Sequence, residues 1–129
     1  IDMGLQEHVT FAGSVNDILN KIKYARILAL SSDYEGIPNV LLEAMSVGVP
    51  VVSTDTSPGG VRVIINNGVN GYIVPRGDYK ELAEKIIKVL NEPSVTEKFI
   101  QNGFTNIKRF NPDTIFEQWN QYINKIAKH

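Results

Sequence analysis

The chain has 129 residues, of which 43% are hydrophobic and 21% charged, a composition typical of one globular domain with a substantial core. It contains no cysteine, which excludes a disulfide-stapled scaffold and any thiolate metal site. The 13 basic and 14 acidic residues give a net charge of −1, so no overall field attracts nucleic acid or an anionic membrane. No apolar run reaches the ~18 residues that a membrane-spanning helix needs.

Four short apolar runs, each closed by polar or turn residues, are predicted to be strands. They are rich in valine, isoleucine and leucine, as expected of strands that are buried on both faces of a parallel sheet. The four runs are residues 9–11, 26–30, 49–53 and 71–74.

Two helices are predicted between the first three runs. The first extends from a cap at Asn16 to about Ala25, because its apolar residues fall on one face. The second covers residues 38–47, because Pro38 suits the first turn of a helix and Gly48 suits the position just after the last turn.

Three more helices are predicted in the C-terminal half. Asp78 and Ser94 are each followed three residues later by a glutamate, the capping-box pattern that opens a helix. Asn111 and Pro112 begin the last helix. Its apolar stripe, which we interpret as packing rather than recognition, consists of Ile115, Trp119, Tyr122 and Ile126.

The alternation of strands and helices over the first 90 residues predicts an α/β fold. Right-handed β-α-β units give a three-layer open parallel sheet with helices on both faces, here followed by extra C-terminal helices. Ligands of such sheets bind at the carboxyl ends of the strands, which directs attention to the loops that follow the four apolar runs.

The loop after the second run enters the helix that Pro38 begins, and it has the features of an anion site. The first-turn N–H groups of a helix have no intrahelical acceptor, and the helix dipole favours negative charge there. Because Pro38 has no N–H, the donors are those of Asn39, Val40 and Leu41. A phosphate group is the expected ligand.

Two carboxylates, Glu35 and Glu43, flank this helix start. Their spacing alone means little, since Glu84 and Glu92 have the same spacing without a preceding strand and glycine. Carboxylates repel a phosphate, so we expect them to accept hydrogen bonds from another part of the ligand, for which the adjacent hydroxyls of a sugar are suitable. The sequence therefore predicts a ligand that combines phosphate with a polyol.

The stretch SSDYEGIPNVLLEAMSVGVPVVSTD, followed by GG and NGVNGYIVP, resembles the C-terminal donor-binding domain of retaining glycosyltransferases of group 1, family 4, which have the two-domain GT-B fold. The resemblance runs from Val9 through Leu90, and Glu35 and Glu43 occupy the positions of the paired glutamates that mark the family. It implies an enzyme that transfers a sugar from a nucleoside-diphosphate sugar to an acceptor hydroxyl with retention, in polysaccharide, capsule or glycolipid biosynthesis.

The resemblance also implies a role for each site residue. Glu43 would hold the ribose hydroxyls, and Glu35 would contact the transferred sugar and act as the catalytic residue. Gly13 and Ser14 would lie beside the nucleobase. The donor, a UDP- or GDP-sugar, would need no metal and no other cofactor. The backbone that would meet its sugar and distal phosphate is that of Gly36, Ile37, Pro38, Asn39 and Val40.

The chain departs from the family pattern in three ways. The family's basic pair, an arginine and a lysine, would precede Ile1, and the acceptor-binding N-terminal domain is absent. Val63 stands where family members commonly have a glutamate. Residues 1–129 are therefore expected to form a single, N-terminally incomplete nucleotide-sugar-binding domain that is inactive by itself. We expect a cytoplasmic protein without a nucleic-acid partner, with any peripheral contact to the inner face of the membrane made through residues outside this chain.

Two other function classes fit parts of the sequence. A non-catalytic phosphate-binding α/β module, such as a signalling receiver, would use Asp33 or Asp55, each of which follows a predicted strand. A GT-B relative with different chemistry, such as a sugar-nucleotide epimerase or a phosphorylase, would share the fold. Phosphorylation of Asp33 or Asp55 by a small phosphodonor would indicate the receiver. The identity of the donor base and the presence or absence of a nucleotide requirement would distinguish the GT-B relatives from a glycosyltransferase.

Overall fold

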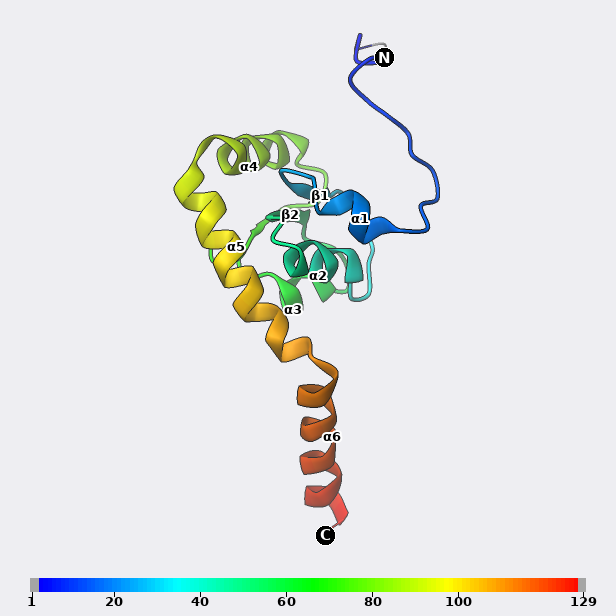
Figure 1. Ribbon diagram of the computed structural model, residues 1–129, viewed down its shortest axis with the longest axis vertical. Coiled ribbons are helices and arrows are strands. Elements are labelled where there is room, and N and C mark those ends of the chain that lie inside the picture. The colour runs from blue at the N-terminus through cyan, green and yellow to red at the C-terminus, as the bar shows by residue number, and fades with distance from the viewer. Residues whose placement is uncertain (1–2, 128–129) are drawn as a thin grey trace.

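The computed structural model describes residues 3–127, and Figure 1 shows a parallel sheet between two layers of helices. The strands are β1 (Leu28–Leu30), β2 (Val51–Thr54) and β3 (Tyr72–Val74), in that order across the sheet. Leu28 lies opposite Val51, and Val52 lies opposite Tyr72. The helices are α1 (Ile18–Ile22), α2 (Asn39–Ser46), α3 (Gly60–Ile64), α4 (Tyr79–Asn91), α5 (Pro93–Ile107), the 3₁₀ turn η1 (Lys108–Phe110) and α6 (Pro112–Ala127).

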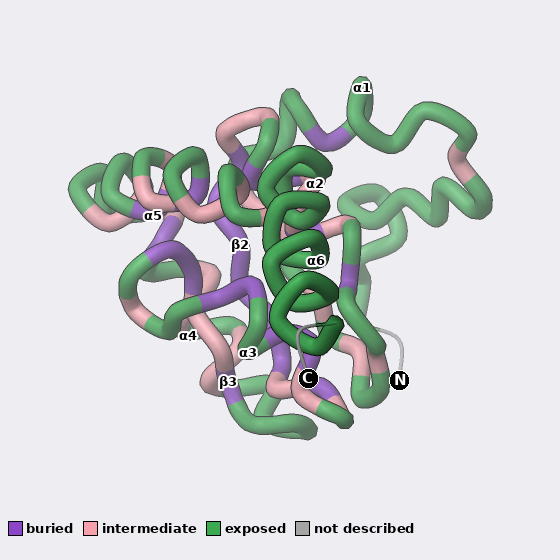
Figure 2. The backbone as a smooth tube through the Cα atoms, turned by 90° about the horizontal axis from the view of Figure 1, so that it is seen from below, coloured by how far each residue is buried: buried purple, intermediate pink, exposed green. Residues whose placement is uncertain are grey.

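The central strand β2 is buried along its whole length and divides the core in two. Successive side chains of a strand point to opposite faces, so Val51 and Val52 belong to different clusters. Val51 packs with residues of α1, α2 and α3, whereas Val52 packs with Val89 of α4 and Phe99 of α5. Figure 2 shows this buried centre and the exposed helices around it. The predicted α/β fold is confirmed, with β2 buried on both faces.

Three of the four predicted strands are confirmed within two residues, but the strand predicted over residues 9–11 is wrong. This segment is not paired, and the side chains of Val9 and Phe11 are 48% and 95% exposed. A strand needs a neighbour to which its backbone can hydrogen-bond, and residues 9–11 pair with none of β1, β2 and β3.

Two of the predicted helix boundaries are confirmed by their hydrogen bonds. The backbone N–H of Glu81 donates to the Asp78 carboxylate at 2.9 Å, so Asp78 caps α4. Gly48 follows the end of α2 with a φ of +74°, a left-handed conformation that favours glycine. Its N–H donates to the carbonyl of Met45, which closes the last turn before β2.

The remaining boundaries differ from the predictions. Asp17, not Asn16, caps α1. The helix ends at Ile22 rather than near Ala25, because the chain has to turn before β1 begins at Leu28. Pro38 is the cap of α2 rather than its first residue. Helix α5 begins at Pro93 instead of at a cap on Ser94, since proline suits the first helical position and α4 ends two residues earlier. The short helix α3 was not predicted, because five residues are too few to show a helical period.

The last helix, α6, extends away from the sheet (Figure 1). All its residues are exposed, so the packing role expected for its apolar stripe is not found within residues 3–127. Trp119 is 60% exposed and Tyr122 58%. Over the same residues, no helix combines the length and hydropathy that crossing a membrane requires.

Candidate functional site

The predicted site lies at the carboxyl end of β1, in the loop of residues 31–38 that leads into α2. The neighbouring loop, residues 55–59 after β2, holds it by two backbone hydrogen bonds. Ser57 N–H donates to the Asp33 carbonyl at 3.0 Å, and Glu35 N–H donates to the Ser57 carbonyl at 3.0 Å. The hydroxyl of Thr54, at the end of β2, also donates to the Ser32 carbonyl. The path of the 31–38 loop is therefore set by the next strand and its loop.

Glu35 is half-buried in this loop. Its Oε1 accepts a hydrogen bond of 2.9 Å from the Ser32 hydroxyl. Oε2 has no hydrogen-bond partner among the residues that the structure describes. The side chain is thus held by one oxygen while the other can still accept hydrogen bonds from a ligand.

The first turn of α2 presents free backbone donors, as predicted. Pro38 is buried and has no N–H, and Leu41 N–H donates to the Pro38 carbonyl at 3.0 Å. The N–H groups of Asn39 and Val40 have no acceptor within residues 3–127. Together with the helix dipole, these two groups can bind an anion at the edge of the sheet. Of the three donors expected from the sequence, only that of Leu41 is already engaged.

Glu43 is the fifth residue of α2 and is half-buried. Its carboxylate has no hydrogen-bond partner in the described part of the chain. It lines a hollow of about 420 Å³ that lies between α2 and the junction of α5 and α6. The other residues that line this hollow are Leu42, Ser46, Ile107, Lys108, Phe110 and Asn111. Glu43 is therefore available to a ligand, and its surroundings include a lysine that the sequence did not point to.

The structure does not bring Gly13 and Ser14 to this site. Both are exposed, and a Cβ atom built on Gly13 would have no other atom within 4 Å. Figure 1 shows the segment before α1 running outside the body of the domain. The role expected for these two residues beside a nucleobase stays a prediction.

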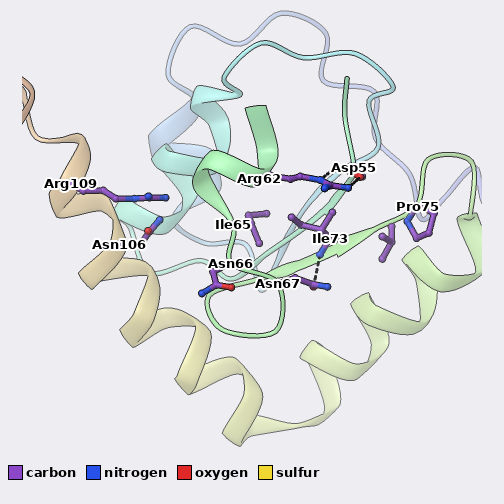
Figure 3. A pocket seen from close by; sticks show the side chains of 10 residues that line it. Asp55, Arg62, Ile65, Asn66, Asn67, Ile73, Pro75, Asn106 and Arg109 are labelled. Atoms are coloured by element: carbon purple, nitrogen blue, oxygen red, sulfur yellow. Dashed lines mark hydrogen bonds and ion pairs between the residues drawn. The ribbon is translucent and has the colours of Figure 1, made fainter. Parts of the chain in front are cut away.

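Two further hollows in the described structure lie elsewhere, at the ends of β2 and β3. The first, of about 620 Å³, is lined by Arg62, Asn106 and Arg109 among others (Figure 3). The second, of about 550 Å³, adjoins it through Asp55 and Arg62 and includes Arg76. Neither is lined by residues 31–43, but both lie at the loops after the third and fourth apolar runs, to which the sequence directs attention. Both are open surface depressions whose charges are partly paired.

Arg62 and Asp55 form the ion pair in these hollows. Arg62 Nε donates to Asp55 Oδ1 at 2.8 Å, and Nη2 donates to Oδ2 (Figure 3). These hydrogen bonds, with the positive charges of Arg62 and Arg76, hold the pKa of the Asp55 carboxyl below its usual value. The Arg62 guanidinium is therefore engaged by Asp55 in the structure.

We expect Arg62→Gln to raise the pKa of Asp55, because its main hydrogen-bond donor and nearest charge are removed. A pKa that folding lowers makes the carboxylate stabilising above its unfolded pKa, and this contribution is lost as the pH falls through the folded pKa. The pair is exposed, so the effect on stability should be small. Carboxyl-carbon NMR titration would measure the shift, with Asp17, whose pKa is lowered by Asn20, as the unaffected reference. An unchanged Asp55 titration would contradict the assignment.

No group of three or more His, Cys, Asp or Glu residues that could hold a metal ion is present in residues 3–127.

Comparison with known proteins gives consistent matches along almost the whole chain. Residues 2–106 match the family model described as glycosyl transferases group 1. The capsular polysaccharide biosynthesis glycosyltransferase CapM of Staphylococcus aureus is 30% identical over 94% of this chain and 32% of its own length. The phosphatidyl-myo-inositol mannosyltransferase of Mycobacterium leprae is 31% identical over 96% of this chain and 33% of its own length. The chain thus spans about a third of the length of these two relatives.

Among solved structures, Anabaena HepE in complex with UDP aligns with a TM-score of 0.84 and 29% identity, over 95% of this chain and 34% of HepE. Its complex with UDP-glucose aligns with a TM-score of 0.83. The family match covers the sheet, the 31–38 loop, α2 and most of α5, the elements that build the site described above. The chain belongs to the group 1 glycosyl transferase family.

Proposed function

We propose that this chain is the donor-binding part of a glycosyltransferase that transfers a sugar from a nucleoside-diphosphate sugar to an acceptor hydroxyl with retention. The pathway would be polysaccharide, capsule or glycolipid biosynthesis, as in the relatives named above. UDP is the favoured nucleotide, because HepE, which shares the fold at 29% identity, is known in complex with UDP and with UDP-glucose. A GDP-sugar is the alternative donor.

One observation carries this proposal: the free N–H groups of Asn39 and Val40 lie at the start of a helix that is flanked by Glu35 and Glu43, each with carboxylate oxygen free to accept hydrogen bonds. The amides suit a phosphate, and the carboxylates suit sugar hydroxyls. A sugar nucleotide contains both groups in one molecule.

The proposed reaction assigns a role to each group. The bond between the anomeric carbon and the diphosphate breaks, and the diphosphate leaves with the electron pair. The acceptor oxygen then bonds the same carbon on the face that the diphosphate leaves, and the acceptor's proton passes to an oxygen of the departing diphosphate. The amides of Asn39 and Val40 stabilise the charge that develops on the diphosphate, together with a basic pair from outside this chain. Glu35 contacts the sugar and stabilises positive charge at the anomeric carbon, and Glu43 holds the ribose. No metal is needed in this scheme.

We further propose that the acceptor binds to a domain outside these residues, at a cleft that both parts form. The exposed apolar side chains of α6, among them Trp119 and Tyr122, would be covered in the longer protein. We place the whole protein in the cytoplasm, peripheral to the inner face of the membrane when its acceptor is a lipid.

The test is an amide NMR titration of the ¹⁵N-labelled chain with UDP-glucose, GDP-mannose and ADP-glucose. We expect one of the three to shift the amides of Gly36, Asn39, Val40 and Glu43, because these line the proposed phosphate and sugar site. The same sample should transfer no sugar to an added acceptor, because the proposal assigns acceptor binding to residues outside these 129 and the chain spans about a third of the length of its relatives.

Absence of shifts with all three sugar nucleotides at millimolar concentration would contradict donor binding by this chain. Shifts confined to the hollows at Arg62 and Arg76 would place the nucleotide elsewhere. Robust sugar transfer by the 129 residues alone would contradict the proposal that the donor and the acceptor bind to different domains.

A further inference from the structure

The 31–38 loop rests against the start of α3 as well as against the 55–59 loop. Its backbone is joined to Ser57 by the two hydrogen bonds of 3.0 Å described above, in a parallel bridge between Tyr34 and Ser57. Three residues after Ser57, the chain reaches Gly60, the first residue of α3, which is buried. The loop that carries Glu35 is therefore supported by the backbone of Ser57 and, three residues later, by that of Gly60.

Gly60 contacts the backbone of Gly36 so closely that no side chain fits between them. A Cβ atom built on Gly60 would lie 1.4 Å from the Gly36 carbonyl oxygen, 2.5 Å from the Gly36 carbonyl carbon and 3.1 Å from the Ile37 nitrogen. All three atoms belong to the main chain, so no rotamer change can relieve the overlap. Any other residue at position 60 must move the peptide between Gly36 and Ile37.

The reason for glycine at position 60 differs from the reason for glycine at position 59. Gly59 has a φ of +104°, so it serves the backbone conformation of the turn, and a Cβ built on it would meet no atom within 4 Å. Gly60 has no positive φ and would accept a side chain but for Gly36. The missing side chain at position 60 is thus specific to the 31–38 loop.

We propose that Gly60 is a positioning residue for the sugar nucleotide, acting through the Gly36–Ile37 peptide. This inference rests on the proposed function. That peptide lies between Glu35 and the cap residue Pro38, so its position fixes the Glu35 carboxylate relative to the free amides of Asn39 and Val40. Gly60 thereby fixes the distance between the groups proposed to hold the sugar and those proposed to hold the distal phosphate. It does so without contacting the sugar or the phosphate.

The experiment compares Gly60→Ala with Gly77→Ala in the same chain. Unlike Gly60, Gly77 has a positive φ of +78°, and a Cβ built on it would meet no atom within 4 Å, so alanine there strains the backbone without approaching Gly36. Both variants are titrated by NMR with the sugar nucleotide that binds wild type in the titration above, and with its nucleoside diphosphate.

We expect Gly60→Ala to shift the amides of Gly36 and Ile37 before ligand is added. It should weaken sugar-nucleotide binding by about ten- to hundredfold, the factor expected when one hydrogen bond to a charged group is lost. The nucleoside diphosphate, which lacks the sugar, should lose less affinity. Gly77→Ala should bind both ligands as wild type does. An effect on stability alone would not produce this difference between the two ligands.

Three outcomes separate the inference from the function on which it rests. If wild type binds no sugar nucleotide, the proposed function fails. If wild type binds and Gly60→Ala binds equally well, or loses the same factor for both ligands, the inference fails. If Gly60→Ala does not fold, the wild-type titration decides, because the inference requires the Gly60 amide to shift with the sugar nucleotide and to shift less with the diphosphate.

Discussion

Replacing Phe99 with alanine should destabilise the domain by about 3–5 kcal/mol, the usual cost of removing a buried aromatic ring from a core. Phe99 is 2% exposed and forms the centre of the cluster on the α4 face of the sheet, with Val52 and Val89. Its ring meets that of Tyr72 edge to face at 4.9 Å, so the truncation also removes an aromatic contact between α5 and β3.

Urea unfolding followed by circular dichroism would measure this loss, and Phe116→Ala is the matched control. Phe116 is 67% exposed on α6, so its truncation should change the free energy of unfolding by no more than about 0.5 kcal/mol. A cost at Phe99 no larger than that at Phe116 would mean that α5 does not pack on the sheet in solution.

The buried strands could be predicted from the sequence because their signal is local. Residues 26–30, 49–53 and 71–74 are apolar runs bounded by turn residues, and each contains a strand of the sheet. Residues 9–11 have the same local signal but form no strand. Whether an apolar run becomes a strand depends on a neighbour to pair with, which a local pattern does not contain.

The helix ends show which local rules are reliable. Asp78 and Gly48 act through contacts within four residues, and both predictions are confirmed. Ser94 satisfied the same capping pattern as Asp78, yet Pro93 begins α5 because α4 ends at Asn91 and only Glu92 lies between the two helices. The start of α5 was therefore set by the preceding helix and not by the capping pattern.

The candidate site was predictable only in part. The strand, the proline and the helix start together indicated free amides at Asn39 and Val40, and the structure leaves these amides without an acceptor within residues 3–127. The support that Gly60 gives to Gly36 was not predictable, because it joins residues 24 positions apart through a contact between backbone atoms. The lysine beside Glu43 is missed for the same reason, since η1 is far from α2 in the sequence.

Replacing Glu43 with alanine should weaken binding of the sugar nucleotide by about ten- to hundredfold, because hydrogen bonds to a charged group contribute roughly 1.5–3 kcal/mol. The carboxylate makes no hydrogen bond within residues 3–127, so its removal should leave the fold and the urea midpoint nearly unchanged. Glu43→Gln, which keeps an acceptor oxygen but not the charge, should retain part of the affinity.

Glu84→Ala is the control for Glu43→Ala, since Glu84 is also a helical glutamate with a second glutamate eight residues away. It is exposed on α4, a helix that adjoins neither the 31–38 loop nor α2 in the core. NMR titration of both variants should therefore show weakened binding only for Glu43→Ala. Equal affinities for the two variants would show that the spacing of the glutamates was coincidental and that Glu43 does not hold the nucleotide. A loss limited to Glu43→Ala would mean that the carboxylate in the middle of α2 holds the nucleotide, whereas a glutamate with the same spacing on another helix does not.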